Sequence, residues 1–270
     1  MDDDEASGGR IRWWLWPNVL GLDAPVVAVV WLWAFARSGG AEWPGGAVFA
    51  ALFGAVWCIY LADRLADARR AGPVQAPRHL AARRHGNFFA VLLAGVAAAT
   101  ATVTLRHLPA SLLGPGAVLA GVAGLYFWVF VRSAGKSSRP GKEIAAGAIF
   151  AAGVTLPVWA RTGIPGPPLA VAIGVFAGIC ALNCLAIEER ETTRRPGRLR
   201  LLAWLCLACG GLPWIPPDGG AGSRELGLCL TAAAAAEAAA FFSANRMTPD
   251  RFRVLADAAL LAPLWILPCG

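Results

Sequence analysis

The chain has 270 residues, of which 57% are hydrophobic and only 15% are charged, and its formal net charge is +7. A soluble domain carries about 25% charged residues, so the composition excludes an ordinary soluble protein and favours a polytopic membrane protein. The basic residues fall in short loops between apolar runs, and the positive charge therefore needs no nucleic-acid partner to explain it. The chain opens with four acids after Met1 and lacks a basic n-region, which predicts no signal peptide.

The apolar runs predict an all-α fold, with a single integral membrane domain after a polar tail at residues 1–12. We expect nine spanning helices, at residues 17–36, 47–66, 88–105, 112–131, 143–160, 168–187, 199–215, 226–243 and 253–269. The runs are rich in Ala and Gly, and Gly147 and Gly153 predict close approach of helix backbones. The seven cysteines lie in or beside these runs, which favours core packing over a disulfide framework.

The loops between the predicted helices alternate in charge. All Lys and Arg residues except Arg37, Arg106, Arg161 and Arg224 fall on the side of the N-terminus. The positive-inside rule therefore places the N-terminus in the cytoplasm, and nine crossings place the C-terminus outside. We expect an integral protein of a bacterial inner membrane, with a site that faces the cytoplasm.

Two aspartates, Asp63 and Asp67, lie at the end of the second predicted helix. They are four residues apart, so both carboxylates face one side of a helix. Such a pair at a membrane boundary can share a divalent metal, and Arg64, Arg69 and Arg70 can hold the phosphates that the metal would bridge. The alternative is a solvated helix end whose charges pair with one another.

A second acidic cluster, made of Glu188, Glu189 and Glu191, follows the sixth predicted helix on the same side of the membrane. Two facing acidic clusters with cations between them, Lys142 included, suit a metal–diphosphate site. The carboxylates bind Mg²⁺, the metal and the cations neutralise the leaving diphosphate, and an apolar cavity takes the hydrocarbon. The alternative is an ordinary basic loop in which the acids form salt bridges.

This arrangement resembles the UbiA superfamily of intramembrane prenyltransferases. That family has nine helices, a cytoplasmic N-terminus and two motifs of the form N-D-x-x-D-x-x-x-D at the ends of helices 2 and 6. Asp63 and Asp67 match the last two aspartates of the first motif, whereas Ile59 and Tyr60 stand at its first two positions.

The second motif is met in part. Asn183 matches its asparagine and Glu191 its last acid, whereas Cys184 and Ile187 replace the two aspartates between them. Glu188 and Glu189 are acidic neighbours that could substitute. Two further features are similar to the family: Lys142 with the later Gly147-x-x-Phe150-x-x-Gly153, and Arg78-His79 where the family keeps Arg-Pro.

The resemblance implies Mg²⁺-dependent transfer of a polyprenyl group from its diphosphate to an aromatic or other lipophilic acceptor. Asp63, Asp67, Glu188 and Glu191 would hold the metal, and Arg64, Arg69, Arg70, Arg78 and Lys142 would bind the diphosphate. Tyr60 and Trp57 lie deeper in the membrane, where their rings could shield a carbocation, and Tyr60 is the third candidate catalytic residue beside the two aspartates. Asn183 is expected to line the pocket.

Three acids lie within apolar runs: Asp23, Glu237 and Asp257. Asn18 is close to Asp23 in the chain. Acids at membrane depth usually face the bundle interior or a polar cavity, so Asp23 and Glu237 are also candidate pocket residues. The missing motif aspartates leave open a diverged UbiA-like lipid- or isoprenoid-binding protein, and the buried acids leave open a small proton- or cation-coupled transporter. The CDP-alcohol phosphotransferases are set aside, because Arg64 stands where their signature needs glycine.

Overall fold

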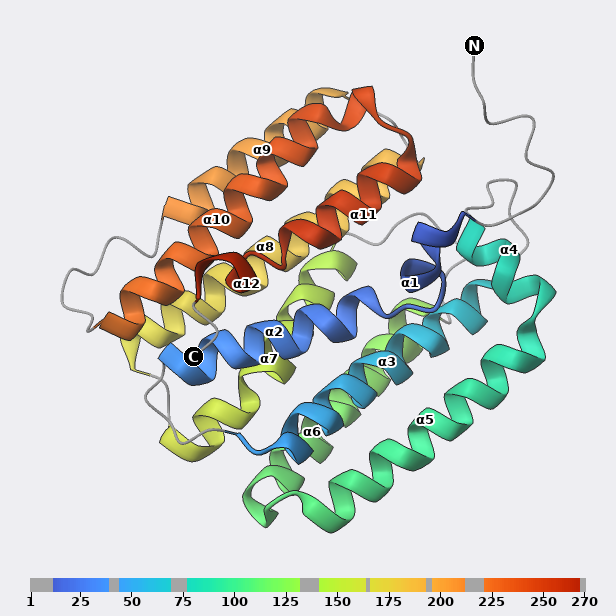
Figure 1. Ribbon diagram of the computed structural model, residues 1–270, viewed down its shortest axis with the longest axis vertical. Coiled ribbons are helices and arrows are strands. Elements are labelled where there is room, and N and C mark those ends of the chain that lie inside the picture. Colours follow the sequence, from blue (N-terminus) through green and yellow to red (C-terminus); the bar gives the residue numbers. More distant parts are fainter. Residues whose placement is uncertain are drawn as a thin grey trace.

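The computed structural model describes residues 12–38, 44–68, 77–131, 141–163, 166–192, 196–211 and 221–267, and these residues form helices and no strand (Figure 1). The α-helices are α1 (Trp16–Val19), α2 (Asp23–Ser38), α3 (Gly46–Ala68), α4 (Pro77–Arg84), α5 (Gly86–His107), α6 (Ala110–Tyr126), α7 (Lys142–Thr162), α8 (Pro167–Thr192), α9 (Pro196–Gly211), α10 (Ala221–Ser243), α11 (Pro249–Ala259) and α12 (Pro263–Ile266). Short turns of other helix types are η1 (Trp13–Leu15), η2 (Phe127–Val131) and η4 (Ala244–Arg246).

Each predicted span overlaps helix in the part of the chain that the structure describes. Among the described residues, six segments are long and apolar enough to cross a membrane: Gly46–Ala66, Gly86–His107, Ala110–Phe130, Lys142–Thr162, Pro167–Glu191 and Arg224–Arg246. The first predicted span is a bent pair of helices that would make a seventh. The seventh predicted span is the 16-residue α9, and the ninth is divided between α11 and α12. The structure thus supports an integral membrane protein, while nine crossings and their orientation stay predictions. Helix α4 was not predicted.

The first span is broken between α1 and α2, which are bent by 73°. Gly21 lies in the break with a φ of +68°, a conformation that glycine adopts at little cost. Two α3 side chains bind carbonyl groups at the break: the indole nitrogen of Trp57 donates to Leu20 O at 2.9 Å, and Arg64 donates at 3.0 Å to Asn18 O, which also accepts from Gly21 N at 3.1 Å. Because lipid offers no hydrogen bonds, these contacts allow irregular backbone at this position.

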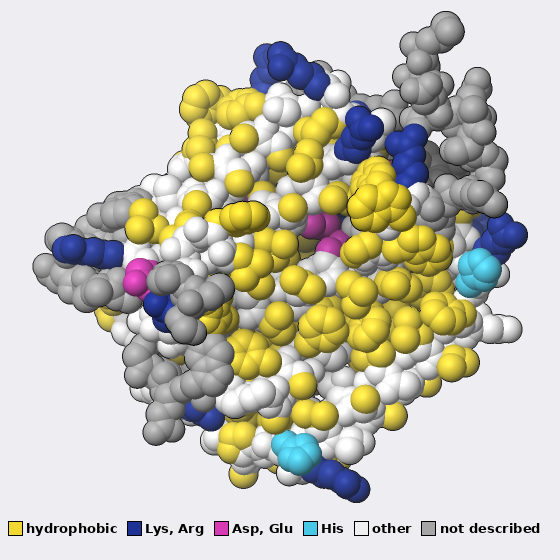
Figure 2. Space-filling view, in the orientation of Figure 1, with side chains coloured by type: hydrophobic (Ala, Val, Ile, Leu, Met, Phe, Trp, Pro, Cys, Tyr) yellow, Lys and Arg dark blue, Asp and Glu magenta, His cyan; other side chains and the backbone are white. Residues whose placement is uncertain are grey.

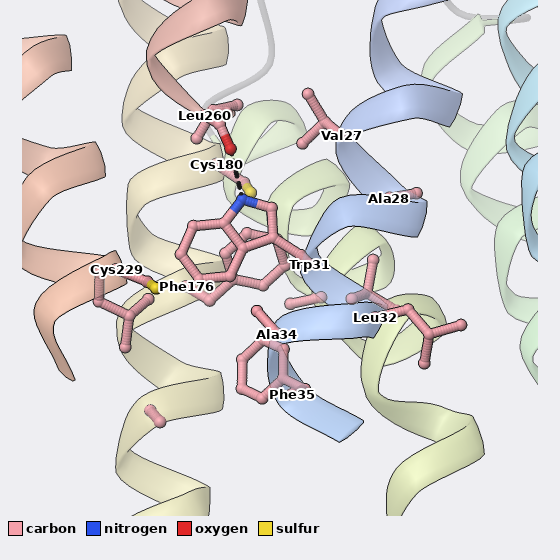
Figure 3. Packing of buried hydrophobic residues seen from close by; sticks show 14 of the residues in the cluster. Val27, Ala28, Trp31, Leu32, Ala34, Phe35, Phe176, Cys180, Cys229 and Leu260 are labelled. Carbon is pink, nitrogen blue, oxygen red and sulfur yellow. Dashed lines mark hydrogen bonds between the residues drawn. The ribbon is translucent and has the colours of Figure 1, made fainter. Parts of the chain in front are cut away.

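The largest core cluster surrounds α2. Trp31 and Phe35 of α2 are fully buried against Phe176 of α8, and the ring centroids of Trp31 and Phe176 are 4.5 Å apart (Figure 3). The α7–α8 pair packs at Gly147, where an added methyl group would stand 2.6 Å from the Ala177 carbonyl oxygen. This confirms the predicted close approach of backbones at Gly147. At Gly153 the same methyl group would make an ordinary contact of 3.6 Å.

The outer helices α5 and α6 expose most of their apolar surface, including Val91, Leu105, Val118 and Leu125. On the face drawn in Figure 2, hydrophobic side chains spread across the middle and Lys and Arg lie towards the rims. Exposed apolar surface of this extent suits contact with lipid.

Candidate functional site

One acidic cluster forms where α3 and α8 end and α7 begins. Tyr126, the last residue of α6, lies within electrostatic reach of Asp63, Glu143 and Glu188. We call these four residues the Tyr126 cluster. The three acids belong to three different helices, so the tertiary fold brings together carboxylates that are up to 125 positions apart in the chain.

Within this cluster the carboxyl groups of Glu143 and Glu188 approach closely enough to hydrogen-bond with each other. Glu143 is buried, although it lies in the first turn of α7. Lys142 and Arg198 lie within electrostatic reach of Glu188. Two adjacent carboxylates with cations beside them can bind a divalent metal that carries a phosphate.

The donor set fits Mg²⁺ in one of its usual forms. Within the described residues, no group of three or more His, Cys, Asp or Glu side chains is arranged so that it could hold a metal ion. Mg²⁺ often takes only one or two protein carboxylates and completes its shell with water and substrate phosphates. Glu143 and Glu188, with Asp63 facing the same tyrosine, match that pattern.

The predicted diphosphate ligands are only partly brought together. Lys142 lies beside Glu188, whereas Arg64 is 2% exposed and reaches the backbone of the broken first span instead. Arg69 and Arg70 lie outside the described residues. The side chains of Asp67 and Arg78 are likewise outside the description, although α3 and α4 include their backbones.

The two other acids of the second predicted cluster face elsewhere. Glu189 pairs with Arg198 at 2.8 Å, and Glu191 pairs with Arg253 of α11 at 3.3 Å. Successive residues on a helix point about 100° apart, so neighbouring acids on α8 meet different helices. Only Glu188 of these three lies in the Tyr126 cluster, and Glu191 belongs to a second polar group.

That second group lies where the broken first span meets α8 and α11. The amide of Asn18 donates to Asp23 at 2.7 Å, and the amide of Asn183 donates to Asp257 at 3.1 Å. Arg253 lies one turn before Asp257, with its Nε 3.9 Å from that carboxylate. We call Asp23, Asn183, Arg253 and Asp257 the Asp257 cluster.

The aromatic residues predicted to shield a carbocation belong to other surroundings. Tyr60 lies within electrostatic reach of Asp23, Asp257 and Arg253, and therefore faces the Asp257 cluster. Trp57 is held by Leu20 and by an edge contact with Phe53, with ring centroids 5.8 Å apart.

Glu237 of α10 belongs to neither cluster, although it lies within electrostatic reach of Asp257. It is fully buried, and the thiol of Cys206 of α9 donates to its carboxyl group at 3.2 Å. Its other oxygen, Oε1, has no hydrogen-bond partner among the described residues.

Sequence reasoning did not select Tyr126 or Glu143 as site residues. Tyr126 gave no signal in the chain, because it lies inside an apolar run with no polar neighbour. Glu143 directly follows Lys142 at the start of a predicted helix, and this was the signal that could have identified it.

Comparison of the chain with protein-family models, with curated protein sequences and with solved structures found no match.

Proposed function

We propose that the chain is a divergent UbiA-like prenyltransferase of a bacterial inner membrane, with nine crossings and a cytoplasmic N-terminus. It would transfer a polyprenyl group from its diphosphate to an aromatic or other lipophilic acceptor. The observation that carries this proposal is the meeting of Asp63, Glu143 and Glu188 around Tyr126, since these acids come from α3, α7 and α8 at one end of each helix.

In this proposal Glu143 and Glu188 would hold Mg²⁺, with Asp63 near the same tyrosine, and the metal would supply positive charge to the diphosphate when bound. Lys142 and Arg198 would neutralise the leaving diphosphate from the protein side, because both lie near Glu188, and Arg198 also pairs with Glu189 at 2.8 Å. Arg69, Arg70, Arg78 and Asp67 stay candidates for the same end of the site, as the family resemblance implies. Glu191 and Arg64 are left out, since each is bound elsewhere.

Aromatic rings lie beside the acids. Tyr126 contacts Phe130, with ring centroids 5.1 Å apart, and Phe127, with centroids 6.0 Å apart. The faces of aromatic rings attract cations, so this group suits an allylic carbocation that forms as the diphosphate leaves. We therefore assign to Tyr126 the shielding role that the sequence suggested for Tyr60 and Trp57.

The test is binding of geranylgeranyl diphosphate to purified protein in detergent, with and without Mg²⁺. We expect Mg²⁺ to strengthen binding of the wild type, and Asp63→Asn and Glu188→Gln each to weaken the Mg²⁺-dependent binding at least about tenfold, which is 1.4 kcal/mol. Glu225→Gln is the matched control, because Glu225 is an exposed acid that pairs with Arg37 on other helices. Binding that is indifferent to Mg²⁺ and to both substitutions would exclude the transferase.

A further inference from the structure

The Asp257 cluster joins three helices of the bundle interior through carboxyl and amide groups. Asp23 begins α2 directly after the break, Asn183 lies on α8, and Asp257 lies on α11. Asn183 donates to Asp257 Oδ1, and the carboxyl groups of Asp23 and Asp257 approach within hydrogen-bonding contact. The side chains of Arg253 and Asp257 keep 14% and 17% of their surface exposed, so the cluster is not sealed within the bundle. Figure 2 shows acidic side chains in a hollow of the apolar face.

Among the described residues, three buried oxygens of this cluster accept no hydrogen bond: Asp23 Oδ1, Asn183 Oδ1 and Asp257 Oδ2. Arg253 Nε, a buried donor, also lacks a hydrogen bond and lies 3.9 Å from Asp257 Oδ2. Asn183 is only 5% exposed, and its amide nitrogen already binds Asp257, which fixes the direction of its free oxygen. Buried acceptors without partners are costly. Free oxygen acceptors that outnumber the free donors match a hard cation, whereas an anion would need donors.

Over the residues that the structure describes, the acids around this cluster outnumber the cations. Arg253 lies within electrostatic reach of three acids, Asp257, Glu191 and Asp23. Arg253 Nη1 is 3.3 Å from Glu191, and Arg253 Nε is 3.9 Å from Asp257. Arg64 donates to the backbone carbonyl of Asn18, whose side-chain amide donates to Asp23. An uncompensated charge in a low-dielectric interior is costly, and one monovalent cation would remove it.

Other titratable groups approach from the neighbouring helices. Tyr60 of α3 and Cys184 of α8 lie within electrostatic reach of Asp257, as does Glu237 of α10. None of these groups adds a positive charge.

We propose that Asp23, Asn183 and Asp257 bind one monovalent metal cation of the size of Na⁺ at the break in the first span. Broken helices at membrane depth commonly form ion sites in membrane proteins, because the break exposes polar groups away from lipid. Here the carbonyl groups of Asn18 and Leu20 already accept hydrogen bonds from α3, so the side-chain oxygens are the available ligands. The site is independent of the transferase site, since it shares no ligand with the Tyr126 cluster.

The test measures thermal unfolding of the full-length protein in detergent while NaCl replaces choline chloride at constant ionic strength. We expect a saturable rise of the unfolding midpoint with Na⁺, because a ligand that binds only the folded state stabilises it. Asp257→Asn and Asp23→Asn should each weaken the apparent Na⁺ affinity at least about tenfold. Asp250→Asn is the control, as it makes the same change on the same helix outside the cluster.

Asp63→Asn should keep the Na⁺ response, which separates this site from the transferase. Line broadening of the ²³Na resonance by the wild-type protein gives a second readout that does not depend on a variant folding. A midpoint that is equal in NaCl and choline chloride, with no ²³Na broadening, would overturn the proposal. A midpoint that rises on acidification but does not respond to Na⁺ would also overturn it, and would indicate a proton shared by Asp23 and Asp257 instead.

Discussion

The indole nitrogen of Trp31 donates a hydrogen bond to the carbonyl oxygen of Leu260 at 2.7 Å, which joins α2 to the turn between α11 and α12 (Figure 3). The Trp31 ring is fully buried, so no water replaces this bond. The contact ties the broken first span to the C-terminal part of the chain, which supplies Arg253 and Asp257 to the Asp257 cluster.

Trp31→Phe should destabilise the protein by about 1–3 kcal/mol, since it removes a buried donor and leaves space beside Phe176. Thermal unfolding in detergent measures the effect. Trp265→Phe is the control, because Trp265 is 88% exposed and should change the midpoint little. Equal midpoints for the two variants would show that the bond to Leu260 does not contribute to stability.

Gly147→Ala should destabilise the α7–α8 pair. Its methyl group would stand 2.6 Å from the Ala177 carbonyl oxygen and 2.8 Å from the Ala181 nitrogen, and backbone atoms cannot move aside as a side chain can. Gly153→Ala, on the same helix, should be neutral or stabilising by up to about 1 kcal/mol from helix propensity. The difference between the two unfolding midpoints is the measurement, and the reverse order would contradict the packing at Gly147.

Gly21→Ala should also destabilise the protein, by about 1 kcal/mol or more, because alanine is strained at a φ of +68°. The new Cβ would also lie 3.2 Å from Tyr60 Cβ and press on the side chain that faces the Asp257 cluster. Gly45→Ala, which meets no atom within 4 Å, is the control for thermal unfolding. If both variants unfold at the wild-type midpoint, the break does not require glycine.

Arg253→Met should cost about 3–5 kcal/mol, since it leaves Glu191 and Asp257 without the cation between them. Arg37→Met removes a more exposed ion pair with Glu225, at 3.4 Å, and should cost at most about 1 kcal/mol. Unfolding midpoints at low and high salt separate the two cases, because salt screens exposed pairs far more than buried ones. Similar losses for both variants would indicate that Arg253 is accessible to solvent.

Much of the helical framework could be predicted from the sequence. The apolar runs gave helix positions within a few residues, for example 143–160 for α7, which spans Lys142–Thr162. The missed helix α4 has a low apolar content, so its eight residues gave no membrane-helix signal. The break at Gly21 was missed because Asn18 and Asp23 lay inside a run that was otherwise apolar.

The apolar helices, and the charged residues at their ends, follow from the length and composition of each run, which act locally. Which of these charges meet depends on how the helices pack. Glu188 faces Glu143, while Glu189 and Glu191 turn to Arg198 and Arg253. The reason is geometric: adjacent helical residues point about 100° apart, and the partner of each depends on which helix packs on that side.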